Sequence, residues 1–277
     1  ATAIATNARA RMVPVHRPPR VPANREPHCE WTVSIDPAAE EVTEPEITRV
    51  MSRTRLANIV IPRPKSTQSG GMDYYDGSVF EQLQLEQLSH AALVVVCSEL
   101  AVQVHLLVVG LMYAVAERYG EAAAMTVAEF QMAGSGWVVS ERLKIWLGCD
   151  GEGIDDVISV LQVHPAFQPS EYWSIQLTRL DDTRALFELL DCPASAEDLP
   201  YGWHALLARG MTGGLEGIVK GVDVRAQVVA SEKSSLAWEI IIDGTDAFSE
   251  EMLSVQIAKG TVLYQTKLQD HIQLLQL

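Results

Sequence analysis

The sequence lacks the common signatures of nucleotide-dependent and metal-dependent enzymes. It contains no glycine-rich phosphate loop, dinucleotide fingerprint, nucleophile elbow or paired-histidine metal motif. Its four cysteines are far apart, without the short spacing of a zinc site or a redox dithiol: Cys29, Cys97, Cys149 and Cys192. We therefore predict no metal site. The absences exclude familiar catalytic signatures but not catalysis itself, and they leave the question of a cofactor open.

Basic residues are scarce in most of the chain. The net charge is −15, from 21 Lys and Arg against 36 Asp and Glu. Binding of DNA or RNA needs clustered Lys and Arg, and anionic membrane surfaces attract the same residues. We therefore predict neither a nucleic-acid nor a membrane partner. Unpaired cysteines, and a start without a long apolar run, predict a reducing cytoplasmic location.

Proline is absent from residues 66–164, but nine of the thirteen prolines lie in residues 1–65. The run VPVHRPPRVPANREP cannot form a helix, because proline lacks the donor N–H and restricts the residue before it. Residues 1–65 hold 10 Lys and Arg against 7 Asp and Glu, a net of +3, whereas the remainder is strongly acidic. We predict a basic, extended arm over residues 1–70 that lies across an acidic body, its own or a partner's.

The proline-free part is typical of long helices. Ser89 is placed to cap a helix that ends at Gly120, and a second helical stretch from Glu121 ends at Gly148. Residues 171–190 and 222–242 each contain two β-type runs around a polar turn, and helical segments lie between them.

This order predicts an α+β fold, with an N-terminal helical half of long helices and a C-terminal half of two β-hairpins flanking short helices. Residues 71–246 then form a small-molecule-binding type of domain. Residues 247–277 are predicted as an amphipathic docking helix. Its apolar stripe consists of Tyr264, Leu268, Ile272 and Leu275.

The most apolar segment, residues 88–120, carries polar side chains through its middle. A membrane span needs about 20 predominantly apolar residues with few or no charges, so a central Glu99 argues against one. At about 100° per residue, Glu99, Gln103 and Glu117 share one side of the helix, with Tyr113 at the edge. This strip is either a solvent-facing edge or the wall of a pocket. In a pocket, Glu99 or Glu117 would be the acid or base, and Gln103 and Tyr113 would bind ligand.

His105 lies away from that strip, among apolar residues, and we expect it to be a core histidine whose N–H is satisfied. A second cluster comprises Asp191, Cys192 and His204. Cysteine, histidine and a carboxylate form a nucleophilic set when they meet in space. The alternative is a small buried thiol, with Asp191 capping a turn. Cys192 and His204 are catalytic candidates and Asp191 a ligand-binding candidate.

Four features give the chain a family resemblance. They are a helix ending VGLMYAVAERYG, a following helix closing SERLKIWLG, a hairpin running into LLDCPAS, and a last unit GIVKGVDVRAQVV…LAWEIII. Across residues 88–243 the chain resembles an uncharacterised family of bacterial cytosolic proteins grouped near the amino-thiazoline carboxylate hydrolases. The resemblance implies a compact cytoplasmic α+β domain that handles a small metabolite, with no cofactor assured.

Two departures from the family pattern weaken an enzymatic expectation. Val109 stands where the family carries an acidic residue before the glycine of the first helix, and RAQVVASEK lacks the cysteines common near the last hairpin. A family site that used those positions would be lost from this chain.

Two functions remain open from the sequence. The first is a cytosolic domain that binds a small metabolite, with or without hydrolase- or lyase-like activity, built into a homo-oligomer or a complex through residues 1–65 and 261–277. The alternative is a non-catalytic structural or accessory subunit of a larger enzyme assembly.

Overall fold

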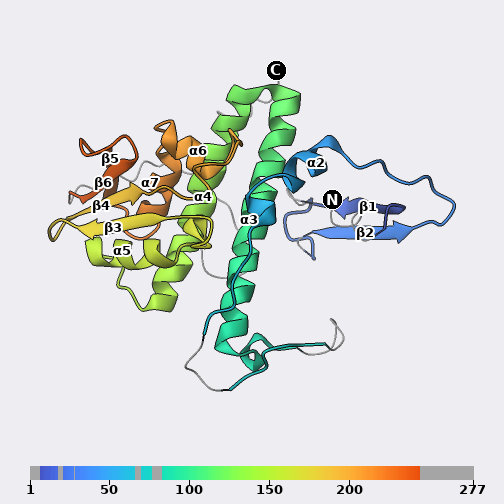
Figure 1. The fold of residues 1–277 in the computed structure, drawn as a ribbon, viewed down its shortest axis with the longest axis horizontal. Helices are drawn as coiled ribbons and strands as arrows, with labels where there is room; N and C mark the ends of the chain where they lie inside the picture. Colours follow the sequence, from blue (N-terminus) through green and yellow to red (C-terminus); the bar gives the residue numbers. More distant parts are fainter. Residues whose placement is uncertain (1–6, 18–20, 28, 66–69, 77–82, 244–277) are drawn as a thin grey trace. The chain divides into compact units, whose positions relative to one another are not determined.

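The computed structural model describes residues 7–17, 21–27, 29–65, 70–76 and 83–243 (Figure 1). The chain divides into two compact units, the first comprising Ala1–Arg53 and the second Thr54–Leu277. The docking helix predicted for residues 247–277 lies outside the described residues.

The described residues of the first unit form a two-stranded sheet and one short helix. Strand β1 (Ala10–His16) pairs antiparallel with β2 (Glu30–Ile35), and helix α2 spans Glu46–Ser52. Of the described residues in this unit, Ala10 alone is buried. The described start of the proline-rich run lies in β1 and is therefore extended, with backbone hydrogen bonds to a second strand that the composition did not reveal.

Two long helices lie in the N-terminal half of the second unit. Helix α3 spans His90–Tyr119 and α4 spans Glu121–Leu147, and they run side by side (Figure 1). The Ser89 hydroxyl accepts a hydrogen bond from the Ala92 N–H at 3.2 Å, so the predicted cap is confirmed. Gly120 separates the helices at φ 90°, a conformation that glycine adopts without steric penalty.

Helix α3 is, among the described residues, the one helix long and apolar enough to cross a membrane, with a mean hydropathy of 2.2. A mostly buried core helix of a soluble protein passes the same test, whereas 28% of the apolar window of α3 is buried. Helix α3 packs against α4 and keeps Glu99 and Glu117 exposed, as expected for a helix in water.

The C-terminal part forms one antiparallel sheet with short helices around it. Its strands are β3 (Ile175–Arg179), β4 (Arg184–Leu189), β5 (Ala226–Ala230) and β6 (Ala237–Ile242), and its helices are α5 (Ile154–Val163), α6 (Trp203–Ala208) and α7 (Gly213–Lys220). The described part of the unit also contains three 3₁₀ turns: Leu56–Asn58, Leu85–Gln87 and Pro165–Phe167. The strand order β3-β4-β6-β5 joins the two predicted hairpins through β4 and β6. The predicted α+β class is confirmed.

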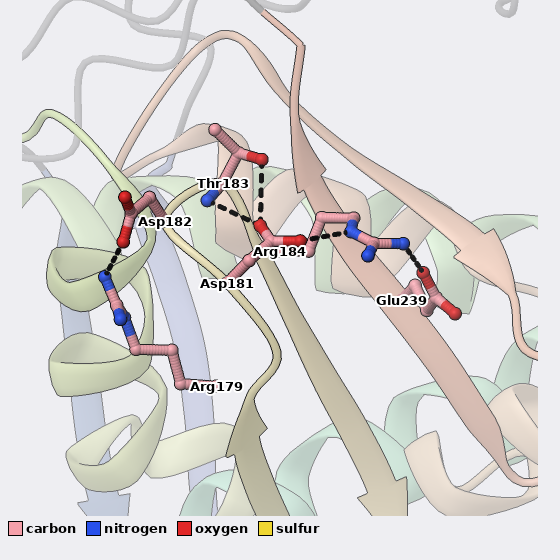
Figure 2. Close-up of polar contacts among 6 residues, drawn as sticks. All are labelled: Arg179, Asp181, Asp182, Thr183, Arg184 and Glu239. Atoms are coloured by element: carbon pink, nitrogen blue, oxygen red, sulfur yellow. Dashed lines mark hydrogen bonds and ion pairs between the residues drawn. The ribbon is translucent and has the colours of Figure 1, made fainter.

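One carboxylate stabilises the turn between β3 and β4 in addition to its backbone hydrogen bonds (Figure 2). Asp181 accepts hydrogen bonds from the Thr183 N–H at 2.9 Å and from the Arg184 Nε–H at 2.7 Å. These two donors, the backbone one first, lower the pKa of Asp181 to about 2. Arg184 also reaches Glu239 on β6 at 3.5 Å, so the predicted Asp-Asp turn is tied to the neighbouring strand.

Helix α7 packs on α4 through a glycine face. Gly217 lies so close to α4 that an added Cβ would stand 2.5 Å from the Cα and the carbonyl oxygen of Ala133. Real Cβ atoms essentially never come within 3.0 Å of such neighbours. The absence of side chains at this face therefore sets the distance between the two helices.

Candidate functional site

A small cavity lies in the second unit between α3, residues 172–173, the loop before α6, and the start of α6. Its volume is about 20 Å³, which is room for one water molecule. We call it the indole pocket, and its polar lining consists of His105, Tyr172, Trp173, Glu197, Trp203 and His204.

Three separate segments bring these side chains together. His105 lies on the buried face of α3, and Trp203 and His204 form the first turn of α6 after Gly202. Trp173 is held by a tight turn, in which its backbone N–H donates to the Pro169 carbonyl at 2.9 Å. No sequence pattern links these segments, because the chain returns to α3 only after α4 and α5.

His105 is a neutral core histidine. Its Nε2 lies 2.9 Å from the Gln168 carbonyl, which can only accept, so the proton resides on Nε2. Burial lowers the pKa of His105 to about 4, against the opposing effect of backbone hydrogen bonds. The ring meets Trp203 edge to face, with the centroids 5.2 Å apart. The expectation of a satisfied core histidine is confirmed.

Three residues that line the pocket each carry a buried polar atom without a hydrogen-bond partner. The atoms are Nε1 of Trp173, Nε1 of Trp203 and Nε2 of His204, on residues that are 3%, 6% and 8% exposed. An unpaired buried polar atom costs about 1–3 kcal/mol. Three of the seven such atoms in the described part of the chain belong to residues that line this one pocket. Burial also lowers the pKa of His204. The lining of the pocket therefore includes two residues with an unpaired indole N–H and one with an unpaired imidazole nitrogen.

Glu197 closes the pocket by tying its loop to the 3₁₀ turn at Leu56–Asn58. One carboxylate oxygen accepts from the Arg55 N–H and the other from the Leu56 N–H, both at 2.9 Å. The Tyr172 hydroxyl donates to the same carboxylate at 3.3 Å. Burial first, and then the charge of Glu197, raise the pKa of Tyr172. One side chain thus links residues some 140 positions apart.

The Glu197→Gln variant is expected to lower the free energy of unfolding by about 2 kcal/mol, because an amide offers one acceptor oxygen where two backbone N–H groups need one each. Chemical denaturation measures the change. Glu216→Gln is the control, since the half-buried Glu216 side chain pairs with Lys220 one helical turn away on the same helix. Equal stability of the two variants would contradict the tie described for Glu197.

The predicted polar strip lies on the solvent side of α3. Glu99, Gln103 and Glu117 are exposed and Tyr113 is half-buried. None of them lines the indole pocket, which His105 reaches from the other side of the helix. Their exposure matches the solvent-facing alternative, and the catalytic and ligand-binding roles considered for them stay predictions.

The second predicted cluster is spread over a turn and a helix. The Ser195 hydroxyl lies 2.8 Å from the Asp191 carboxylate and accepts from the Cys192 N–H at 3.2 Å, an arrangement typical of a turn cap. His204 lines the pocket and Cys192 does not. Among the described residues, no hydrogen bond joins the Cys192 thiol to His204. The nucleophilic role of this set stays a prediction.

No group of three or more His, Cys, Asp or Glu side chains in the described residues could hold a metal ion. The residues that sequence reasoning missed are Tyr172, Trp173, Glu197 and Trp203. The one signal for them is local: the pairs Tyr172–Trp173 and Trp203–His204 gather bulky polar aromatics in two loop-flanking positions.

No protein-family model, curated protein or solved structure matches the chain. The resemblance to the family near the amino-thiazoline carboxylate hydrolases therefore stays a prediction.

Proposed function

We propose that the second unit binds a small neutral molecule with a carbonyl oxygen, a primary amide above all, in the indole pocket. The observation that supports this proposal is that three residues lining one small pocket each carry a buried polar atom without a partner. A carbonyl oxygen can accept from both indole N–H groups of Trp173 and Trp203. The amide nitrogen can then donate to Nε2 of His204 in its acceptor tautomer.

A neutral ligand suits the charges around the pocket better than an anion. Both histidines have lowered pKa values and are uncharged at neutral pH. Glu197 brings a carboxylate to the lining, and its oxygens are already engaged by backbone donors. An anion would meet this negative charge without a compensating cation, whereas a neutral carbonyl gains two hydrogen bonds.

The size of the pocket defines how such a ligand would enter. About 20 Å³ accepts one oxygen-sized group, so the carbonyl oxygen would occupy the buried end. Glu197, Gly202 and Ala205 line the pocket and are half-buried, so the remainder of the ligand would lie toward that side. The loop of residues 190–202 would have to move outward to admit it.

Binding alone is the proposed activity, in a cytoplasmic protein that acts within an oligomer. The arrangement of Cys192 and His204 adds no support for hydrolase- or lyase-like chemistry. The alternative role, as a non-catalytic subunit of an assembly, is favoured by a separate observation, the exposed apolar face of α3.

The test is a titration with acetamide, followed by the indole N–H resonances of the full chain in ¹H–¹⁵N NMR spectra. We expect saturable shifts of the Trp173 and Trp203 resonances. In Trp203→Phe, which has no indole at residue 203, the shift of the Trp173 resonance should be abolished. Trp146→Phe is the matched control. Trp146 is 86% exposed on α4, so this substitution removes an indole outside the pocket lining. Its response to acetamide should equal that of the wild type.

Three results would overturn the proposal. The first is the absence of any shift, which would leave the pocket as the site of one structural water. The second is an equal shift of all six indoles, which indicates non-specific contact. The third is stronger binding of acetate than of acetamide, which contradicts the preference for a neutral ligand.

A further inference from the structure

Helix α3 exposes a continuous apolar stripe that nothing in the described second unit covers. Its positions are spaced three and four residues apart in strict alternation: Cys97, Leu100, Val104, Leu107, Leu111 and Ala114. All six are exposed, and Leu107 is 72% exposed. We call this stripe the α3 seam. It adjoins the polar strip of Glu99, Gln103 and Glu117 but is separate from it.

The spacing of the seam identifies the kind of partner it fits. Alternating steps of three and four residues keep apolar side chains on one line of a helix, the pattern by which two helices pack side by side. From residue 97 to residue 114 the seam extends roughly 26 Å at about 1.5 Å per residue. A contiguous apolar stripe of this kind is typical of an interaction surface. The partner is therefore expected to be another helix of at least this length.

We propose that the α3 seam pairs antiparallel with the α3 seam of a second copy of this chain. In this alignment Val104 lies opposite Leu107 of the second copy, Leu100 opposite Leu111, and Cys97 opposite Ala114. All six positions of one seam then meet all six of the other, as a two-fold interface requires. Among the described helices, α3 alone exposes such a stripe, so the complementary surface is the seam itself.

The charges favour the antiparallel direction. No charged residue lies within the seam. A parallel pair would bring Glu99 and Glu117 level with their counterparts in a chain that already carries a net charge of −15. The antiparallel pair places the two Glu117 side chains at opposite ends of the interface, where their repulsion is screened by salt.

A membrane is the other surface that an apolar helix face could contact. The polar residues beside the seam disfavour it. Glu99, Gln103 and Glu117 lie exposed beside the seam, so a span would carry two carboxylates into the bilayer. Binding at an anionic surface would in addition oppose the net charge of the chain.

The first test compares native masses by sedimentation equilibrium of the full chain. We expect a dimer for the wild type, and a monomer for Leu107→Glu, with association weakened about 100-fold or more by charges buried in the seam. Gln103→Glu is the matched control, because it adds the same charge one turn away, outside the seam, and should remain dimeric. A monomeric wild type, or a dimer unaffected by Leu107→Glu, would overturn the proposal.

A disulfide cross-linking test distinguishes antiparallel from parallel pairing of the two α3 helices. The background variant replaces Cys29, Cys149 and Cys192 by serine and retains Cys97. In the antiparallel pair, Cys97 faces Ala114 of the second copy, so oxidation should cross-link the copies only after Ala114→Cys is added. Cross-linking through Cys97 alone requires the two Cys97 residues to be adjacent, which contradicts the antiparallel arrangement.

Two further measurements test whether a membrane or the C-terminal segment of the same chain covers the seam. Flotation of the wild type with phosphatidylcholine vesicles, lost in Leu107→Glu, would assign the seam to a membrane and overturn the proposal. Deletion of residues 244–277 should leave the dimer intact. A full chain that is monomeric and dimerises only after this deletion would mean that its own C-terminal segment covers the seam, which also overturns the proposal.

Discussion

The Gly217→Ala variant is expected to lower the free energy of unfolding by about 3 kcal/mol, the upper part of the range for overpacked cores. The added methyl group would stand 2.5 Å from the Cα and the carbonyl oxygen of Ala133, both backbone atoms of α4. A flexible side chain could turn aside, but a helix backbone can only move as a whole. The variant must therefore separate α7 from α4 and weaken the packing on both sides of the contact.

Gly134→Ala is the matched control for this prediction. Gly134 lies in the middle of α4, with no atom within 4 Å of an added Cβ. Alanine there should raise the free energy of unfolding by about 1 kcal/mol, since it restricts the unfolded chain and favours helix. Urea denaturation of the two variants should thus give changes of opposite sign. A Gly217→Ala variant as stable as Gly134→Ala would show that the helices are not in close contact at Gly217.

Acidification from pH 7 to pH 4 is expected to lower the free energy of unfolding by about 3 kcal/mol for each of two buried histidines. Burial lowers the pKa of His105 and of His164 to about 4. His164 holds its tautomer by donating from Nε2 to the Gly136 carbonyl at 3.2 Å and accepting from the Ala166 N–H at 3.1 Å. Protonation of either ring would therefore place a charge in the core.

The pH range over which stability is lost follows from the different pKa values of each ring in the folded and in the unfolded chain. In the unfolded chain a histidine takes up its proton near pH 6.5, whereas these two rings do so only near pH 4 in the folded protein. Between these values the unfolded state binds more protons, so stability falls as the pH falls. The contribution of the histidines becomes constant only below about pH 3, where the rings are protonated in both states. Asp181, with a pKa of about 2, loses its stabilising charge only at still lower pH.

Denaturant unfolding at several pH values between 7 and 4 measures the loss. His105→Gln keeps a donor for the Gln168 carbonyl and removes one of the two rings, so the loss should fall by about half. NMR titration of the ring of His164 in the folded wild type gives a second, independent reading. A ring that titrates near pH 6.5, or a stability that is flat across the window, would contradict the prediction.

The boundaries of the long helices could be predicted from the sequence because they depend on local chemistry. Ser89 can cap a helix wherever the chain goes next, and Gly120 and Gly148 end helices because their positive φ values suit glycine. The two hairpins were predictable for the same reason, since Asp181 shapes its turn through neighbours within three residues.

The indole pocket was not predictable, because its members come from segments without a shared pattern. In the sequence, His105 is indistinguishable from other core residues of α3, and Trp173 and Trp203 are indistinguishable from other aromatic residues beside loops. The polar side-chain atoms of Trp173, Trp203 and His204 become buried and unpaired only after separate segments of the chain have closed around the same space. Glu197 gave no signal either, since its partners are backbone N–H groups about 140 residues away.

Helix α3 shows which properties follow from the sequence alone and which depend on the tertiary structure. Its sequence by itself determined a long helix with a polar strip of Glu99, Gln103 and Glu117, because side-chain direction follows from 100° per residue. It could not determine which of the apolar faces would be covered, since Leu107 and Val108 are equally hydrophobic neighbours. Packing against α4 and the loops buried Val108 and left Leu107 exposed. That selection is a property of the tertiary structure, because burial depends on what the rest of the chain brings to each face.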